Sequence, residues 1–87
     1  MIILFQFEGC ESSQPVRQRL TELAIDFIAV NAPEKHPEKD QVMVKLFGSA
    51  KTPALWDTMA GALVMGREEC LKHLDRLAAI TGTGQAR

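Results

Sequence analysis

The hydrophobic pattern of residues 1–30 predicts a strand, a helix and a second strand. Residues 1–7 (M-I-I-L-F-Q-F) form an apolar run with the length of a buried strand. The next segment has helical spacing, with apolar residues at Val16, Leu20, Leu23 and Ala24. Residues 25–30 (I-D-F-I-A-V) alternate and are rich in β-formers. This order predicts a parallel pair of strands joined by a right-handed crossover.

Residues 31–47 predict a loop followed by a second helix. Residues 31–40 are polar and contain two prolines, which is typical of a loop. Pro37 can occupy the first turn of a helix that runs to about Phe47, and Gly48 would end it as a C-cap. The inner face of this helix is predicted to carry Val42, Met43 and Leu46.

The last part of the chain predicts a hairpin and a final helix. Residues 54–57 and 62–65 form two short strands around a turn. Gly66 opens a helix whose apolar stripe is Leu71, Leu74, Leu77 and Ala78. Residues 81–87 (T-G-T-G-Q-A-R) have no apolar pattern and predict a flexible tail. The order β-α-β-α-β-β-α predicts a single α/β domain over residues 1–80, with helices covering a mixed sheet.

Composition and charge narrow the class of protein. The 87 residues provide for one small domain, and the apolar fraction of 46% is that of an ordinary soluble protein. A net charge of −1 gives no basic face, so we expect no nucleic-acid partner. No apolar run is long enough to span a membrane, and the chain starts without the features of a signal peptide. Two widely separated cysteines are not a disulfide framework, so a cytoplasmic setting is predicted.

Cys10 stands where the first strand turns into the first helix, with Ser12 or Ser13 as the predicted N-cap. A thiol at a helix N-terminus meets unpaired N–H groups and the positive end of the helix dipole. Both favour the thiolate, which is the reactive form of cysteine. The alternative is that Cys10 is a small buried residue, since free cysteine is often buried. Its place at a helix start favours a functional thiol.

Two segments of the chain carry a family resemblance. Residues 10–20 begin C-E-S-S and resemble the glutaredoxin pattern C-x-x-C/S-x-x-V-R-x-x-L, with Ser13 at the second-cysteine position as in monothiol glutaredoxins. Residues 51–57 (K-T-P-A-L-W-D) are similar to the K-V-P-A-L-x-D segment of glutathione S-transferase amino-terminal domains. Over residues 2–78 the chain therefore resembles a thioredoxin-like, glutaredoxin-like domain with a four-stranded mixed sheet and three helices.

The resemblance implies glutathione-dependent thiol–disulfide exchange, with glutathione as co-substrate. Cys10 would be the nucleophile of a thiol–disulfide oxidoreductase. Lys51, Thr52, Pro53 and Glu68 would help to hold glutathione. The family further implies a cis Thr52–Pro53 bond, with the Thr52 backbone binding the cysteine part of glutathione. The implied partners are glutathione or a protein that bears a thiol or disulfide.

The chain departs from the family pattern in its charges. Glutaredoxins carry a cation shortly before the active cysteine, whereas residues 6–9 here read Q-F-E-G. Glu8 and Glu11 flank the thiol and oppose its ionisation. Arg67 stands where no cation is expected at the start of the last helix. These departures leave open a non-catalytic thioredoxin-like binding domain with a degraded glutathione site.

Two further alternatives involve metal chemistry. An iron–sulfur carrier with Cys10 and glutathione as ligands is a minor option, suggested by the resemblance to monothiol glutaredoxins. Cys70 and His73 stand at i and i+3 in the last helix, but two residues without further ligands are a weak metal signal. We therefore predict no metal site and expect Cys70 to be a structural residue.

Overall fold

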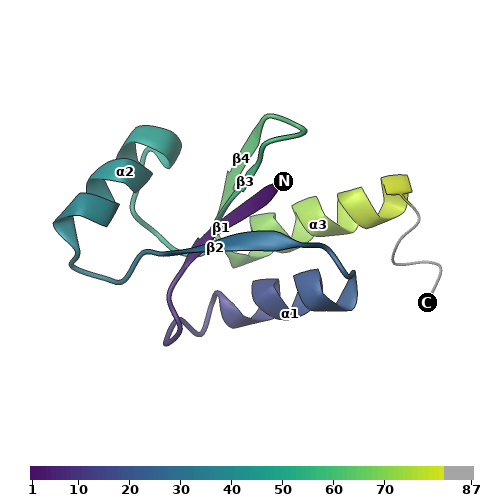
Figure 1. The fold of residues 1–87 in the computed structure, drawn as a ribbon, viewed down its shortest axis with the longest axis horizontal. Helices are drawn as coiled ribbons and strands as arrows, with labels where there is room; N and C mark the ends of the chain where they lie inside the picture. The colour runs from purple at the N-terminus through teal and green to yellow at the C-terminus, as the bar shows by residue number, and fades with distance from the viewer. Residues whose placement is uncertain (82–87) are drawn as a thin grey trace.

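The computed structural model of the protein describes residues 1–81, which form one four-stranded sheet and three helices (Figure 1). The elements are β1 (Ile2–Gln6), α1 (Gln14–Glu22), β2 (Phe27–Asn31), α2 (Pro37–Phe47), β3 (Ala54–Asp57), β4 (Ala62–Met65) and α3 (Arg67–Thr81). In the sheet order β2-β1-β3-β4, β1 is parallel to β2, and the other two pairs are antiparallel. The predicted element order and mixed sheet are confirmed. The tail predicted for residues 81–87 lies outside the described residues, except for Thr81.

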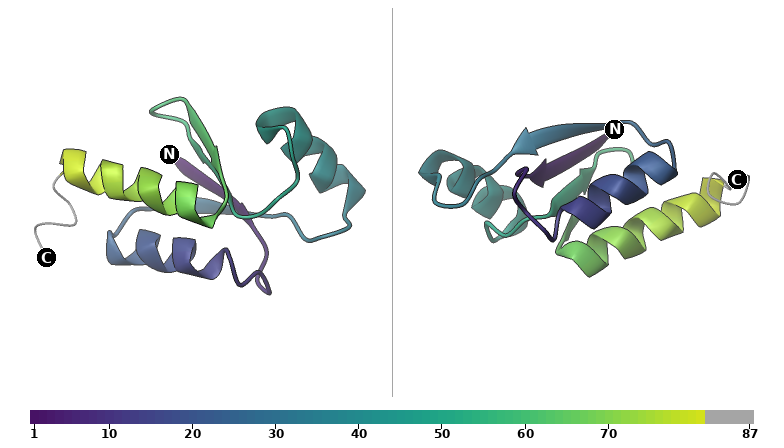
Figure 2. Two further views of the ribbon diagram at one scale, coloured as in Figure 1. Left: turned by 180° about the vertical axis from the view of Figure 1, so that it is seen from behind. Right: turned by 90° about the horizontal axis from the view of Figure 1, so that it is seen from below.

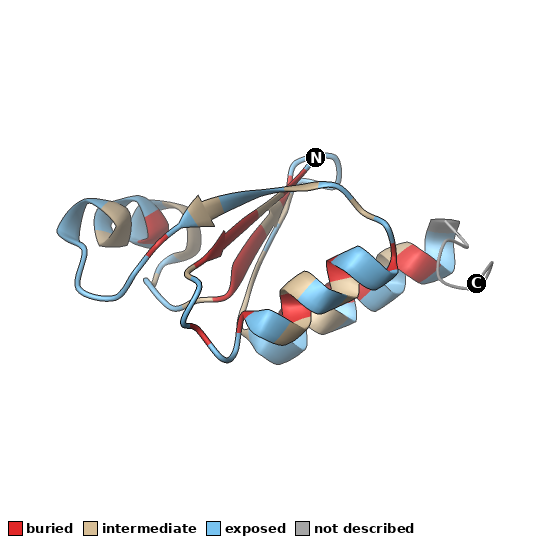
Figure 3. Ribbon diagram, turned by 60° about the horizontal axis from the view of Figure 1, so that its bottom comes forward, coloured by how far each residue is buried: buried red, intermediate tan, exposed pale blue. Residues whose placement is uncertain are grey.

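The helices form two layers around the sheet. Figures 1 and 2 show α1 and α3 side by side on one face, whereas α2 lies beyond one end of the strands. The hydrophobic core between the sheet, α1 and α3 includes Leu4, Val16, Leu20, Leu55 and Leu74. Figure 3 shows this buried stripe running along the inward faces of both helices. No helix within residues 1–81 is long and apolar enough to cross a membrane.

The opposite face of the sheet is covered only at one end. There Met43 of α2 is buried against Phe5 and Ala54, and the rings of Phe5 and Phe47 meet edge to face at 5.3 Å between centroids. Val42, predicted on the inner face of α2, is instead 46% exposed. The prediction was wrong because α2 reaches the sheet only along the line of Met43, so a residue next to it in sequence turns to solvent.

The end of α1 also differs from the prediction. Ala24 has φ of 55°, and its N–H donates to the Thr21 carbonyl at 3.0 Å, while the Ile25 N–H donates to the Leu20 carbonyl at 2.9 Å. This pair of bonds is a Schellman motif with alanine at the left-handed position that glycine usually occupies. The helix therefore ends at Glu22 and the second strand starts at Phe27, not at residue 25.

A buried polar pair links the hairpin of β3 and β4 to α3. His73 Nε2 lies 2.9 Å from Asp57 Oδ2, and the exposed fractions of the two residues are 7% and 3%. The other carboxylate oxygen, Oδ1, accepts hydrogen bonds from the N–H groups of Met59 and Ala60. Burial raises the pKa of Asp57, but the bond from His73 and the backbone N–H groups outweigh it and lower the pKa. The carboxylate thus holds the β3–β4 turn and the helix together.

We predict that Asp57→Ala lowers the free energy of unfolding by about 2–4 kcal/mol, because it leaves the buried His73 ring and two part-buried backbone N–H groups without their acceptor. Asp75→Ala, an exposed aspartate on α3, should cost less than about 1 kcal/mol. Since the Asp57 pKa is lowered in the folded state, its contribution is complete above the unfolded pKa of about 4 and is lost as pH falls. Urea unfolding at pH 7 and pH 3 checks this. An equal cost of Asp57→Ala at both pH values would contradict the assignment.

Candidate functional site

Cys10 lies in the loop that connects β1 to α1. The Cys10 N–H donates to the Phe7 carbonyl at 3.0 Å, and the Ser13 N–H donates to the Cys10 carbonyl at 3.2 Å. Two turns therefore precede α1, and Cys10 stands one turn before the helix rather than inside its first turn. Ser13 occupies the N-cap position, but its side chain makes no capping hydrogen bond. The predicted cap is thus confirmed in position and not in its side-chain contact.

The cysteine meets a second loop, which precedes β3. Cys10 Sγ lies 3.4 Å from Thr52 Oγ1, and the Thr52–Pro53 peptide bond is cis. Pro53 is fully buried, and its carbonyl accepts a hydrogen bond of 2.8 Å from the Gly66 N–H at the start of α3. Because this bond fixes the proline turn against α3, the Thr52 hydroxyl is held in place beside the sulfur.

An open cleft of about 600 Å³ adjoins Cys10. It is lined by residues 9–12, 32–34 and 50–52 together with Phe7. Cys10 lines this cleft but is only 9% exposed, so its sulfur lies at the edge of the cleft. The cleft is large enough for a small molecule. A smaller depression of about 230 Å³ lies next to Cys10 and is lined in part by Glu8, Glu11 and Arg17.

Neutral donors stabilise the thiolate of Cys10. Burial raises its pKa, but the hydroxyl groups of Ser13 and Thr52 and the N–H groups of Ser12 and Ser13 outweigh burial, and the pKa of Cys10 is lowered. The Ser13 hydroxyl is fully buried and has no hydrogen bond of good geometry to any residue in the described part of the chain. Its contribution to the pKa of Cys10 indicates that the thiolate is the acceptor it lacks.

The other predicted site residues separate into two groups. Lys51 and Thr52 line the cleft, and Pro53 forms the turn beneath it. Glu68 is exposed in the first turn of α3, two residues after Gly66, and it is not among the residues that line the cleft. Ser13 is buried, and it contributes to the lowered pKa of Cys10.

Cys70 is unsuited to exchange chemistry. It is fully buried in α3, with its sulfur 3.9 Å from the carbonyl oxygens of Pro53 and Val64. Burial, with a smaller contribution from Glu69, raises the pKa of the Cys70 thiol to about 12. His73 is bound to Asp57, and no group of three metal-binding side chains occurs within residues 1–81.

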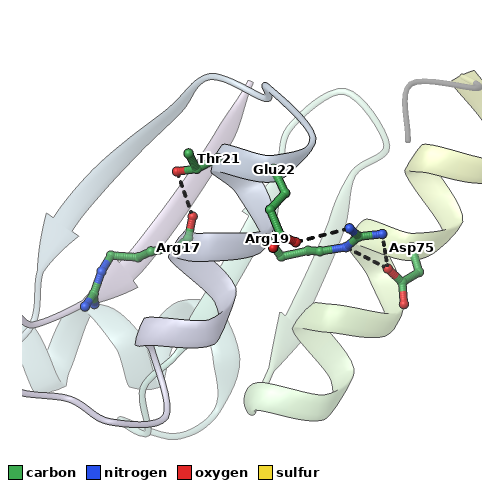
Figure 4. A network of polar contacts seen from close by, with 5 residues as sticks. All are labelled: Arg17, Arg19, Thr21, Glu22 and Asp75. Carbon is green, nitrogen blue, oxygen red and sulfur yellow. Dashed lines mark hydrogen bonds and ion pairs between the residues drawn. The ribbon is translucent and has the colours of Figure 1, made fainter. Parts of the chain in front are cut away.

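Two arginines of α1 are each held by another side chain. Arg17 donates from Nη1 to Gln6 Oε1 at 2.7 Å, and Gln6 in turn donates to Asn31 across β1 and β2. Figure 4 shows Arg19 reaching from α1 to Asp75 of α3, at 3.1 Å. The contact between Arg17 and Gln6 could not be predicted from the sequence, because Gln6 lies in an apolar run.

Comparison with known proteins settles the fold. No protein-family model and no curated protein sequence matches the chain. A glutathione transferase homologue from Sulfitobacter, solved with bound glutathione, superposes with a TM-score of 0.76 over 94% of this chain at 17% sequence identity. A glutaredoxin from Archaeoglobus fulgidus superposes with a TM-score of 0.65 over 86% of this chain at 21% identity. The chain has the thioredoxin-like fold.

The transferase homologue and the glutaredoxins differ in the share of their own length that this chain covers. It spans 39% of the transferase homologue, but 85% of the glutaredoxin from Archaeoglobus fulgidus. It also spans 85% of glutaredoxin C1 from Populus tremula x tremuloides, whose holo form superposes with a TM-score of 0.69 at 16% identity. The predicted thioredoxin-like architecture is therefore confirmed, and the thioredoxin-like domain of either kind of relative matches it.

We predict that Cys10 is alkylated by iodoacetamide at least about a hundredfold faster than Cys70 at pH 8, where a thiol of pKa about 12 is ionised in only about one molecule in ten thousand. The Cys10 rate should rise with pH to a plateau whose midpoint lies below the ordinary value of 9.0. Mass spectrometry of peptides from the folded protein measures both rates. Equal rates would contradict the burial of Cys70.

Ser13→Ala and Thr52→Val should each raise the pKa of Cys10, because each removes a donor to the thiolate. The alkylation rate at pH 7 should fall about two- to fivefold in each variant. Thr21→Val removes an exposed hydroxyl on α1 that donates to the Arg17 carbonyl, away from Cys10, and it serves as the matched control. An unchanged midpoint in Ser13→Ala would show that its buried hydroxyl does not serve the sulfur.

Proposed function

We propose that this protein is a glutaredoxin-like monothiol protein that carries out glutathione-dependent thiol–disulfide exchange through Cys10, in the cytoplasm. The observation that carries the proposal is the position of the Cys10 sulfur: 3.4 Å from the Thr52 hydroxyl, at the edge of an open cleft, with a lowered pKa. The fold is shared with glutaredoxins and with a transferase homologue that binds glutathione. Thiol exchange uses these features directly, since the thiolate is the attacking species.

In this proposal the Cys10 thiolate attacks a disulfide or a glutathionylated thiol, and one half of that disulfide leaves as a thiolate. Cys10 is then joined in a mixed disulfide. Ser13 stands at the position of a resolving cysteine and cannot release it, and Cys70 is buried with a raised pKa. A second thiol, glutathione or that of a partner protein, must therefore complete the cycle.

Glutathione would lie along Thr52, with its sulfur next to Cys10. Lys51, which lines the cleft and forms no ion pair with any residue among 1–81, would meet the glycine carboxylate. Glu68, at the start of α3, would meet the amine of the γ-glutamyl end. Since Lys51 is the one cation among the residues that line this cleft, we expect binding in the millimolar range.

The second candidate is a non-catalytic thioredoxin-like binding domain. It is favoured by the carboxylates of Glu11 and Glu34, which line the cleft and oppose an anionic ligand. This domain would keep the fold and the Cys10 loop without turnover.

A glutathione titration followed by backbone amide shifts, together with an assay on a glutathione mixed disulfide, separates the two candidates. We expect shifts at Thr52 and Glu68, and slow turnover that Cys10→Ser abolishes, because Cys10 is the nucleophile. Cys70→Ala is the matched control and should keep the activity, because that thiol is not ionised. Absence of amide shifts at tens of millimolar glutathione would favour the binding domain, and turnover that survives Cys10→Ser would exclude Cys10 as the nucleophile.

A further inference from the structure

Three carboxylates from two loops surround Cys10. Glu11 lines the large cleft, and with Glu8 it also lines the smaller depression beside the cysteine. Glu34, in the loop between β2 and α2, lines the large cleft as well. All three residues are exposed, and none forms an ion pair within residues 1–81. Their charges are therefore available to a molecule that enters the cleft.

The cations near the cysteine balance these charges only in part. Lys51 lines the large cleft from the loop that carries Thr52. Arg17 lines the smaller depression, but one of its nitrogens is bound to Gln6 at 2.7 Å. Two carboxylates and one ammonium group thus border the large cleft, and the thiolate adds a further negative charge.

The Ser13 hydroxyl is one of the donors that favour this extra charge on the sulfur. It is fully buried, has no partner of good geometry in the described chain and lowers the pKa of Cys10. A buried hydroxyl without an acceptor is costly in a folded protein. An ionised sulfur would accept from this hydroxyl. That sulfur lies at the edge of the cleft that Glu11 and Glu34 also line. Such a site repels anionic disulfides and attracts cationic ones.

We propose that the preferred substrate of Cys10 is a small disulfide that carries an ammonium group within a few bonds of its sulfur. Cystamine is the simplest molecule of this class. A volume of about 600 Å³ suits a molecule of this size. The carboxylates of Glu11 and Glu34 would attract the ammonium groups while the sulfur approaches Cys10. This inference rests on the proposed function, in which Cys10 carries out thiol exchange, and it assigns the substrate class of that exchange.

The exchange step balances without any further oxidant. The Cys10 thiolate forms a bond to one sulfur of the disulfide as the disulfide bond breaks, and the other half leaves as a thiolate that takes a proton from water. Cys10 is oxidised to the mixed disulfide, and the leaving half is reduced. A second thiol, glutathione in the proposed cycle, then attacks the mixed disulfide and releases Cys10 as a thiolate.

The test compares three symmetrical disulfides: cystamine, the neutral bis(2-hydroxyethyl) disulfide and the anionic 3,3′-dithiodipropionate. The rate of mixed-disulfide formation at Cys10 is measured by mass spectrometry and divided by the rate with free 2-mercaptoethanol, which corrects for the leaving group. At low salt we expect the normalised cystamine rate to exceed the dithiodipropionate rate about tenfold. In 0.5 M sodium chloride the ratio should fall to about two, because salt screens exposed charges.

Charge variants assign this preference to named residues. Glu11→Gln and Glu34→Gln should each lower the cystamine-to-dithiodipropionate ratio about two- to threefold, and Lys51→Gln should raise it by a similar factor. Because both rates come from the same variant, a change in thiol reactivity cancels in the ratio. Glu22→Gln, at the far end of α1, is the matched control and should leave the ratio unchanged.

The outcomes separate this inference from the function on which it rests. Exchange at Cys10 with equal normalised rates, or a ratio unchanged in both Glu11→Gln and Glu34→Gln, would overturn the charge preference and leave thiol exchange intact. No mixed disulfide at Cys10 with any of the three reagents would overturn the proposed exchange and the preference together.

Discussion

The antiparallel pairing of β1 with β3 is the contact on which the candidate site depends. The last pair in its register joins Phe5 to Ala54. The loop that follows β1 and the loop that precedes β3 therefore leave the sheet at the same end of the strands. The first loop carries Cys10 and the second carries Thr52. A slip of one residue in this register would reverse the faces of β3 and separate the two side chains. The hydrogen bond from Gly66 to Pro53 then fixes the second loop against α3.

The thiolate form of Cys10 is stabilised by neutral donors rather than by a cation. Hydroxyl and N–H groups from residues 12, 13 and 52 favour the thiolate and together outweigh burial. Because these donors lie close to the sulfur and are held by the fold, the surroundings need not supply positive charge. This explains how Glu8 and Glu11 can stand in the loop of Cys10, and Glu34 can line the same cleft from another loop, while the pKa of the thiol is lowered. In the proposed exchange, the charges that border the cleft would bear on the choice of substrate more than on the reactivity of the thiol.

Local signals were sufficient for most of the fold. The bounds of α2, β3 and β4 follow from proline, glycine and the period of apolar residues, all of which act within a few positions of the chain. The same kind of signal placed Cys10 between β1 and α1. Local signals did not predict the end of α1 at Ala24. An alanine does not indicate a left-handed C′ position, whereas a glycine there would. Local signals also failed at Val42, because which residues of a short helix are buried depends on where the helix meets the sheet.

The sequence by itself therefore determined the order of the elements, the fold class and the residue that could act as a nucleophile. Only the tertiary structure decided what surrounds that residue. Cys10 and Thr52 are 42 residues apart in the chain, and Glu34 reaches the same cleft from a third segment. Arg17 is held by Gln6 of β1, a contact that separates it from the large cleft. These neighbours depend on the register of the sheet and on the packing of its loops, and no local pattern of residues encodes either.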